Sequence, residues 1–287
     1  MKSTLKIALF SAILLIPGMQ SCASNSKKEI NVTQKDTKME TKVLLETSLG
    51  NITVKLYNET PKHRDNFVKL VNDGFYNGVL FHRVISNFMI QGGDPDSKTA
   101  QPNQQLGAGN IGYTIPAEFV FPQYYHKRGA LAAARTGDAV NPNKESSGSQ
   151  FYIVTGTITT DADLNNMEAG KQNALGQSLF QKKVNENMLL IQQLQAEGNQ
   201  QELMNLQNRF EEEIRQALAI SPAFKFTPEQ RETYKTIGGT PFLDNEYTVF
   251  GEVVEGMNVI DKISAVKTAP GDRPIEDVKV LKATVVK

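Results

Sequence analysis

Alternating apolar and polar residues mark the first structured part of the chain. Residues 43–47 and 52–57 alternate on either side of a Ser-Leu-Gly-Asn turn, which is typical of two strands joined as a hairpin. A helix is expected next, over residues 60–72, because Pro61 suits a first helical turn and the apolar residues that follow share one face. This helix should end before Gly74.

The pattern takes on a helical period between residues 157 and 237. Apolar residues recur every three or four positions in two stretches, 180–191 and 203–217, with Gly198-Asn199 between them. This predicts an antiparallel helical hairpin, although one long helix bent at Gly198 is also compatible with the pattern. A further helix should start at the capping box Thr227-Pro228-Glu229-Gln230.

Two interpretations of this helical segment remain open. Neither apolar stripe can stay in water, so the two arms must bury their apolar residues against each other or against a partner. The segment is therefore either a self-contained structural insertion or a docking platform for a substrate or another protein.

The N-terminal residues have the features of an export signal. An apolar stretch at 7–16 follows two lysines, is too short to span a bilayer, and ends at Pro17-Gly18, so residues 1–21 are predicted to be a signal peptide. The sequence Met-Gln-Ser-Cys that ends at Cys22 resembles a bacterial lipobox, in which the cysteine is lipidated. The alternative is an ordinary signal peptide followed by an unmodified thiol.

A lipidated Cys22 would attach the protein to a membrane, because each buried methylene of the acyl chains contributes about 0.8 kcal/mol. Residues 22–41 are polar and are expected to form a disordered tether. The expected location is the cell envelope, on the periplasmic side of a bacterial outer membrane.

Composition limits the partners and cofactors. The 287 residues include 31 acidic and 31 basic side chains, so no excess of positive charge is available to bind nucleic acid. Three widely separated histidines share no ligand spacing with the single cysteine, and no metal site is predicted. With 39% hydrophobic residues, the chain is long enough for a full core in one or two domains.

A glycine- and asparagine-rich stretch between Gly93 and Phe119 is predicted to be a long surface loop. It contains Gly-Ala-Gly-Asn-Ile-Gly at 107–112, which matches the dinucleotide-binding pattern in spacing only. Neither a preceding strand nor a following helix is predicted, so this match is rejected.

Residues 81–94 place one arginine among apolar side chains. The alternation predicts a strand with Arg83 on one face, and Phe88 and Met89 return after a turn at Ser86-Asn87. A guanidinium beside an apolar pocket suits recognition of a backbone amide or a carboxylate. Taken singly, Arg83 would be interpreted as part of a surface ion pair, and Phe88 and Met89 as ordinary core.

This segment and two others in the same order resemble the cyclophilin family of peptidyl-prolyl cis/trans isomerases. The second comprises residues 129–135 and 147–153, and the third comprises residues 242–244 and 247–257. Together the matching blocks cover roughly residues 42 to 156 and 238 to 286.

The resemblance implies a mainly β fold. The expected architecture is a closed eight-stranded antiparallel barrel, capped by helices near 60–72 and 256–264. The cyclophilin-like domain would span residues 42–286 and would be interrupted by an α-helical insertion at 157–237, which has no counterpart in the minimal family domain.

The resemblance also implies the site residues. Arg83 would be catalytic, and Gln91 would hold it in position. The residues that would line the proline pocket are Phe88, Met89, Tyr152, Leu243 and Tyr247. Those that would contact the client backbone are Ala134, Arg135 and Gln150. Phe242 stands where the best-known members have tryptophan, so weaker binding of cyclosporin-type inhibitors is expected, because phenylalanine lacks the indole N–H donor.

The implied activity is peptidyl-prolyl isomerisation in exported proteins, with no cofactor and no covalent intermediate. The expected partners are proline-containing polypeptides, a membrane reached through the lipid anchor, and a protein that could dock on the helical insertion. The rival interpretation is a binding module that holds proline-containing segments, or uses the insertion as a chaperone arm, with turnover incidental.

Overall fold

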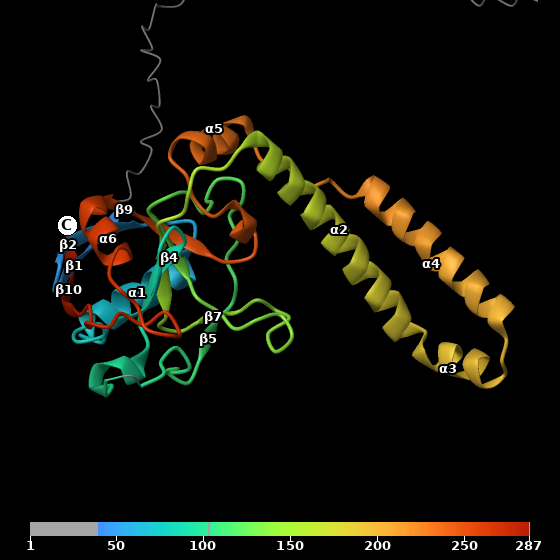
Figure 1. Ribbon diagram of the computed structural model, residues 1–287, viewed down its shortest axis with the longest axis horizontal. Coiled ribbons are helices and arrows are strands. Elements are labelled where there is room, and N and C mark those ends of the chain that lie inside the picture. Colours follow the sequence, from blue (N-terminus) through green and yellow to red (C-terminus); the bar gives the residue numbers. More distant parts are fainter. Residues whose placement is uncertain (1–39, 103, 287) are drawn as a thin grey trace, which may run out of the picture. The chain divides into compact units, whose positions relative to one another are not determined.

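The predicted hairpin forms the strands β1 (Thr41–Thr47) and β2 (Gly50–Leu56), which pair antiparallel. The computed structural model describes residues 40–102 and 104–286 (Figure 1). The buried positions on both strands alternate with partly exposed ones, as the sequence pattern predicts, and Val43 and Val54 are among those that enter the main core.

Eight strands form one antiparallel sheet in the order β10-β1-β2-β9-β6-β8-β4-β3. The other six are β3 (Phe81–Ile85), β4 (Met89–Gly92), β6 (Ala130–Ala133), β8 (Phe151–Val154), β9 (Val249–Glu255) and β10 (Val280–Val286). A second, small sheet pairs β5 (Thr114–Ile115) with β7 (Ser146–Ser147). The predicted mainly β fold is confirmed.

The prediction of a closed barrel is wrong, because the curled sheet stays open between β3 and β10. Where the two edge strands begin, Leu80 and Lys279 form an isolated bridge, and backbone hydrogen bonds connect residues 78–81 with residues 278–280. Further along β3, the N–H of Val84 donates to the carbonyl of Asp272 at 2.8 Å. An irregular segment around Asp272 therefore supplies a hydrogen-bond acceptor for this part of the β3 edge. The strand neighbour of β10 is β1.

Two helices pack against the sheet where the capping helices were expected. The first, α1 (Pro61–Asn72), buries Phe67, Leu70 and Val71, and α6 (Met257–Ser264) buries Val259, Ile260 and Ile263. Burying each of these apolar side chains contributes about 1.5–3 kcal/mol. The hydroxyl of Thr60 does not cap α1 and donates instead to the carbonyl of Tyr57 at 3.4 Å.

The helical segment contains α2 (Asp161–Glu186), α3 (Met188–Ala196), α4 (Gln200–Ile220) and α5 (Pro228–Thr236). The chain reverses at Gly198, which has a left-handed φ of 68°, so the hairpin is confirmed and the single bent helix is excluded. Figure 1 shows α2 and α4 side by side, with α3 between them in the chain, at the turn of the hairpin. A break at Asn187, between α2 and α3, was not predicted.

The two arms of the hairpin bury apolar residues against each other, and α5 begins at the predicted capping box. The buried residues of this small core are Leu194, Leu206, Phe210 and Ile214. Two short 3-10 helices, η1 (Pro95–Thr99) and η2 (Pro241–Leu243), complete the elements. The division of residues 42–286 into a domain and an insertion at 157–237 stays a prediction.

The predicted signal peptide at 1–21, the lipidation site at Cys22 and most of the tether at 22–41 lie outside the described residues. Among the helices that the structure does describe, none is both long enough and apolar enough to cross a membrane.

Candidate active site

Most of the predicted site residues line one open cavity of about 310 Å³. They are Arg83, Phe88, Met89, Gln91, Ala134, Arg135, Tyr152, Leu243 and Tyr247. The cavity also contains His82, Leu106 and Gly107, which the sequence analysis did not identify as site residues. Gln150 and Phe242 lie outside this lining.

The strands β3 and β4 bring a cation beside an apolar wall. Arg83 pairs with Gln91 in the ladder between these strands, and Met89 begins β4 just after the turn. The side chain of Arg83 is 43% exposed, whereas Met89 is buried in the cavity wall. A half-exposed arginine next to an apolar surface can donate hydrogen bonds to a bound molecule without leaving its strand.

The apolar wall is a separate cluster of side chains. It lies on the face of the sheet opposite to the main core. Met89 and Tyr152 are buried in it, while Phe88, Leu243 and Tyr247 are only partly buried. The rings of Tyr152 and Tyr247 meet edge to face at 5.9 Å. Because the partly buried residues also line the cavity, they form a pocket wall as well as core.

The prediction that Gln91 holds Arg83 in position stays a prediction. The carboxamide of Gln91 donates to Oε1 of Gln150 at 3.0 Å, and Nε of Arg83 lies 3.4 Å from Oδ2 of Asp272. The side-chain amide of Gln91 is therefore directed at the carbonyl oxygen of the Gln150 side chain. Asp272 was not predicted, because it lies in an irregular segment with no local sequence signal.

Gln150 holds the glycine-rich loop against the cavity. Its amide donates to the carbonyls of Gly107 at 3.0 Å and Gly109 at 2.8 Å, and its own oxygen accepts from Gln91. This loop was predicted to lie on the surface, yet it supplies Leu106 and Gly107 to the cavity. No sequence signal could reveal this, because glycine-rich loops lack a pattern that shows which face is covered.

Arg135 is more enclosed than a simple client contact requires. Its side chain is 4% exposed, its Nε donates to the carbonyl of Glu246 at 2.9 Å, and Nη1 pairs with Asp138. The guanidinium lies 4.4 Å over the ring of Tyr247. The side chain therefore supports Tyr247, and its predicted contact with a client backbone stays a prediction.

Phe242 stands at the rim. It is 49% exposed and stacks on Phe88 with ring centroids 5.7 Å apart. Its ring extends the apolar surface of Phe88 outward from the cavity lining, where a bound ligand could reach it.

Two buried groups near Arg83 stay uncharged. Burial lowers the pKa of His82 to about 4, so the imidazole is neutral at pH 7. Burial also raises the pKa of the Tyr152 phenol well above its usual value, and its hydroxyl lies 2.9 Å from Nε2 of His126. Among the residues that line the cavity, Arg83 and Arg135 are the two that carry a guanidinium group.

Comparison with known proteins decides the family. The family model described as "Cyclophilin type peptidyl-prolyl cis-trans isomerase/CLD" matches residues 42–218 and 228–285. The chain belongs to the cyclophilin-type peptidyl-prolyl isomerases. It is an enzyme of this class, EC 5.2.1.8.

Relatives of this cyclophilin include two proteins named "Putative peptidyl-prolyl cis-trans isomerase". The protein from Staphylococcus aureus (strain USA300) is 31% identical over 240 residues, which covers 83% of this chain and 88% of the relative. The protein from Staphylococcus saprophyticus is 31% identical over 243 residues, which covers 84% of this chain and 89% of the relative. These matches extend well beyond the three motifs.

A solved structure supports the fold. The cyclophilin-type isomerase of Cryptosporidium parvum superposes with a TM-score of 0.50 at 18% identity, covering 87% of this chain and 99% of that one. At this level of identity the likeness concerns the fold alone.

Proposed function

We propose that this cyclophilin accelerates the isomerisation of X-Pro bonds in exported proteins at the cell envelope. The observation that carries the proposal is that the guanidinium of Arg83 and the apolar surfaces of Phe88 and Met89 line the same cavity. A proline ring fits the apolar wall, and the cation lies where it can reach the bond before that ring.

The mechanism follows from the chemistry of the peptide bond. Rotation meets a barrier of about 18–20 kcal/mol, because resonance gives the C–N bond partial double-bond character. In the twisted amide the prolyl nitrogen regains its lone pair and can accept a hydrogen bond. Arg83 would donate that bond, which exists only in the transition state and so accelerates the reaction.

The magnitude shows that Arg83 does not act alone. One hydrogen bond to a charged group contributes about 1.5–3 kcal/mol, or roughly one to two decades of rate. Gripping the proline ring while the preceding carbonyl rotates supplies orientation. Transfer of the planar amide out of water is a further contribution. No bond is broken in this reaction, so neither a cofactor nor a nucleophile is required.

The envelope location rests on the lipobox-like sequence at Cys22, which precedes the polar tether. A lipid there would hold the enzyme at the outer membrane on its periplasmic side, next to proline-containing polypeptides that have just been exported. In the full-length protein, Cys22→Ala should move the enzyme from the membrane to the soluble fraction. Retention of that variant on the membrane would contradict the anchor.

A prolyl-peptide exchange assay on the soluble form that begins after Cys22 tests the chemistry. Arg83→Ala should lower kcat/KM by roughly 10- to 100-fold. Arg83→Lys keeps the charge but loses the planar guanidinium, so its kcat/KM should lie between those of the unmodified enzyme and Arg83→Ala. The surface substitution Arg215→Ala, on α4, is the matched control. Full activity of Arg83→Ala would refute the mechanism.

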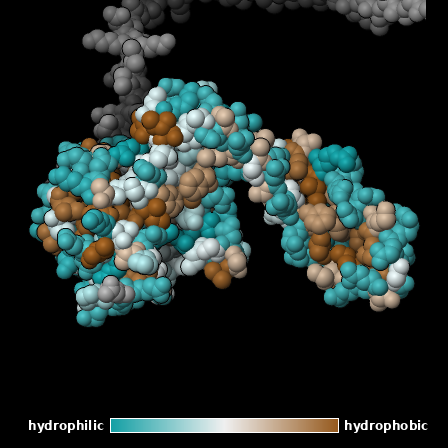
Figure 2. Space-filling view, in the orientation of Figure 1, coloured by the Kyte–Doolittle hydropathy of each residue, from teal (hydrophilic) through white to brown (hydrophobic). Residues whose placement is uncertain are grey.

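A second function, client binding by the helical insertion, is favoured by exposed apolar side chains. Leu189 is 83% exposed and Ile220 is 86% exposed. Figure 2 shows apolar surface on the face of the α2–α4 hairpin that it displays. Such side chains could hold unfolded, proline-containing segments near the active site.

A partial deletion separates the two functions. Gly176 of α2 lies against Leu218 of α4, so closely that a methyl group on Gly176 would meet Cδ1 of Leu218 at 3.5 Å. Replacing residues 177–217 with a short glycine linker would remove the end of the hairpin but keep its base. This variant should isomerise peptides normally and fail to suppress aggregation of an unfolded client. Unchanged suppression would exclude a chaperone role for the removed part.

A further inference from the structure

A buried chain of hydrogen bonds runs from the helical insertion to the wall of the proline pocket. The hydroxyl of Tyr234, on α5, donates to Oδ2 of Asp244 at 2.6 Å. The other oxygen, Oδ1, accepts from the backbone N–H of His126 at 2.8 Å and lies 2.9 Å from its Nδ1. Nε2 of His126 lies 2.9 Å from the hydroxyl of Tyr152.

Asp244 joins the two ends of the chain. Its carboxylate accepts, so Nδ1 of His126 carries a proton, and Nε2 of the same ring shares a hydrogen bond with the Tyr152 hydroxyl. All four side chains are buried, so water does not compete for these bonds. The position of the Tyr152 ring is therefore fixed by a carboxylate that itself depends on Tyr234.

A second link reaches the same segment from α2. The ammonium of Lys171 donates to the carbonyl of Asp244 at 2.7 Å and lies 3.8 Å from Glu246. Glu246 in turn pairs with Arg135, whose guanidinium covers Tyr247. Lys171 thus holds the segment that supplies Leu243 and Tyr247 to the cavity.

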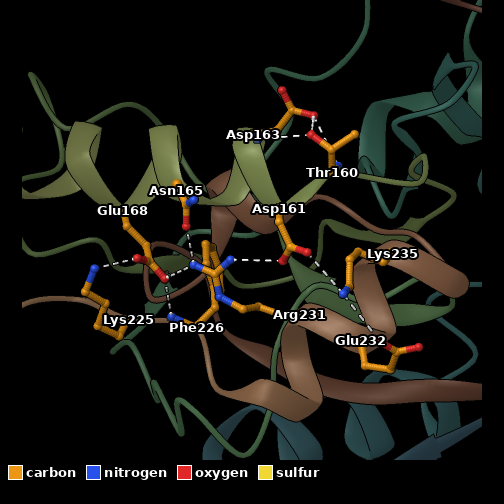
Figure 3. A network of polar contacts seen from close by, with 10 residues as sticks. All are labelled: Thr160, Asp161, Asp163, Asn165, Glu168, Lys225, Phe226, Arg231, Glu232 and Lys235. Carbon is orange, nitrogen blue, oxygen red and sulfur yellow. Dashed lines mark hydrogen bonds and ion pairs between the residues drawn. The ribbon is translucent and has the colours of Figure 1, made fainter.

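At the base of the insertion, a network of polar contacts connects α5 to α2. Figure 3 shows Arg231 of α5 between the acidic side chains of α2, bonded to Glu168 at 2.7 Å and Asp161 at 3.2 Å. Glu168 also accepts from the N–H of Phe226 at 3.0 Å. Burial acts to raise the pKa of Glu168, but the hydrogen bonds it accepts lower it below the usual value, so the carboxylate stays charged.

We infer that the base of the helical insertion is a positioning element of the proline pocket. Tyr234 and Lys171 act through Asp244 on Tyr152, Leu243 and Tyr247, so the insertion completes the active site. The inference rests on the proposed use of this pocket for proline. It assigns to Tyr234 and Lys171 an effect on catalysis, although neither lines the cavity.

Tyr234→Phe in the otherwise intact chain tests the first link, because it removes only the hydroxyl. We expect kcat to fall roughly three- to tenfold with little change in KM, since the pocket would still bind proline but align it less well. The methyl NMR signal of Met89, in the pocket wall, should shift. Tyr125→Phe is the matched control: its hydroxyl also bonds to α5, at Thr233, but its bond does not lead to the pocket.

A double-mutant cycle excludes a merely structural effect. Tyr152→Phe cuts the same chain at its other end, so adding Tyr234→Phe to it should cause no further loss of kcat. Additive losses, an equal loss in Tyr125→Phe, or unchanged kcat and Met89 signal in Tyr234→Phe would each overturn the inference.

A second pair of variants covers the case in which Tyr234→Phe does not fold. Lys171→Met should lower kcat, and Lys183→Met, further along α2 and paired with Glu213, should not. Equal activity of the two would overturn the inference. If the unmodified enzyme fails to isomerise prolyl peptides, the proposed function fails instead, and the Met89 signal still reports whether the insertion positions the pocket.

Discussion

The Nε atom of Arg83 lies 3.4 Å from Oδ2 of Asp272, which is 189 positions further along the chain. The carbonyl of Asp272 also accepts from the N–H of Val84, next to Arg83 on β3. The aspartate has a left-handed φ of 65°, a conformation uncommon outside glycine. Two bonds thus connect this irregular segment to the strand that carries Arg83.

Asp272→Asn should lower kcat/KM about two- to fivefold, because the variant frees the guanidinium to leave its catalytic orientation. Both partners are 43% exposed, and exposed ion pairs are worth about 0.2–1 kcal/mol. The prolyl-peptide assay should show the difference at low salt and a smaller one in 1 M salt. Asp261→Asn, which breaks the surface pair with Arg128, is the control. Equal activities at low salt would remove Asp272 from the mechanism.

Gln150→Leu should release the glycine-rich loop from the cavity. The variant loses the bonds to Gly107 and Gly109 and the acceptor for Gln91. One such bond is worth about 1 kcal/mol, or about fivefold in rate, so kcat/KM should drop at least about fivefold. Amide hydrogen exchange of residues 107–110 should accelerate in parallel. A loop that exchanges as slowly as in the unmodified protein would show that Gln150 does not hold it.

The burial of His82 predicts a loss of stability in acid. Its folded-state pKa of about 4 lies below the ordinary value of about 6.5, so below pH 6.5 the unfolded chain takes up a proton that the folded protein does not. The free energy of unfolding should therefore be highest above pH 6.5 and fall by about 3 kcal/mol from this group between pH 7 and pH 4.

Urea unfolding at pH 7 and pH 4 measures this loss. His82→Gln, which cannot titrate, should show a smaller drop in unfolding free energy than the unmodified protein, whatever its stability at pH 7. The same drop in both proteins would mean that His82 is protonated as easily in the folded state as in the unfolded one.

Phe242 predicts the response to cyclosporin-type inhibitors. The ring is at the rim and stacks on Phe88, but it offers no hydrogen-bond donor. Binding weaker than nanomolar is expected, and Phe242→Trp should tighten it about fivefold by adding one N–H donor. Titration calorimetry of both proteins decides this, and nanomolar affinity of the unmodified enzyme would contradict it.

Much of the fold could be predicted because its signals are local. The hairpin of β1 and β2, the helix α1 and the reversal at Gly198 follow from periodicity and from single residues with special backbone preferences. The grouping of Arg83 with Phe88 and Met89 was also predictable, since one strand and a short turn connect them.

The sequence by itself thus determined most of the elements, the family and most of the cavity lining. Only the tertiary structure decided that the sheet stays open, that Asp272 lies beside Arg83, and that Tyr234 and Lys171 both bond to Asp244. Periodicity reports which face of an element is buried. It carries no information on which distant residue supplies the partner, because that depends on how the elements pack in three dimensions.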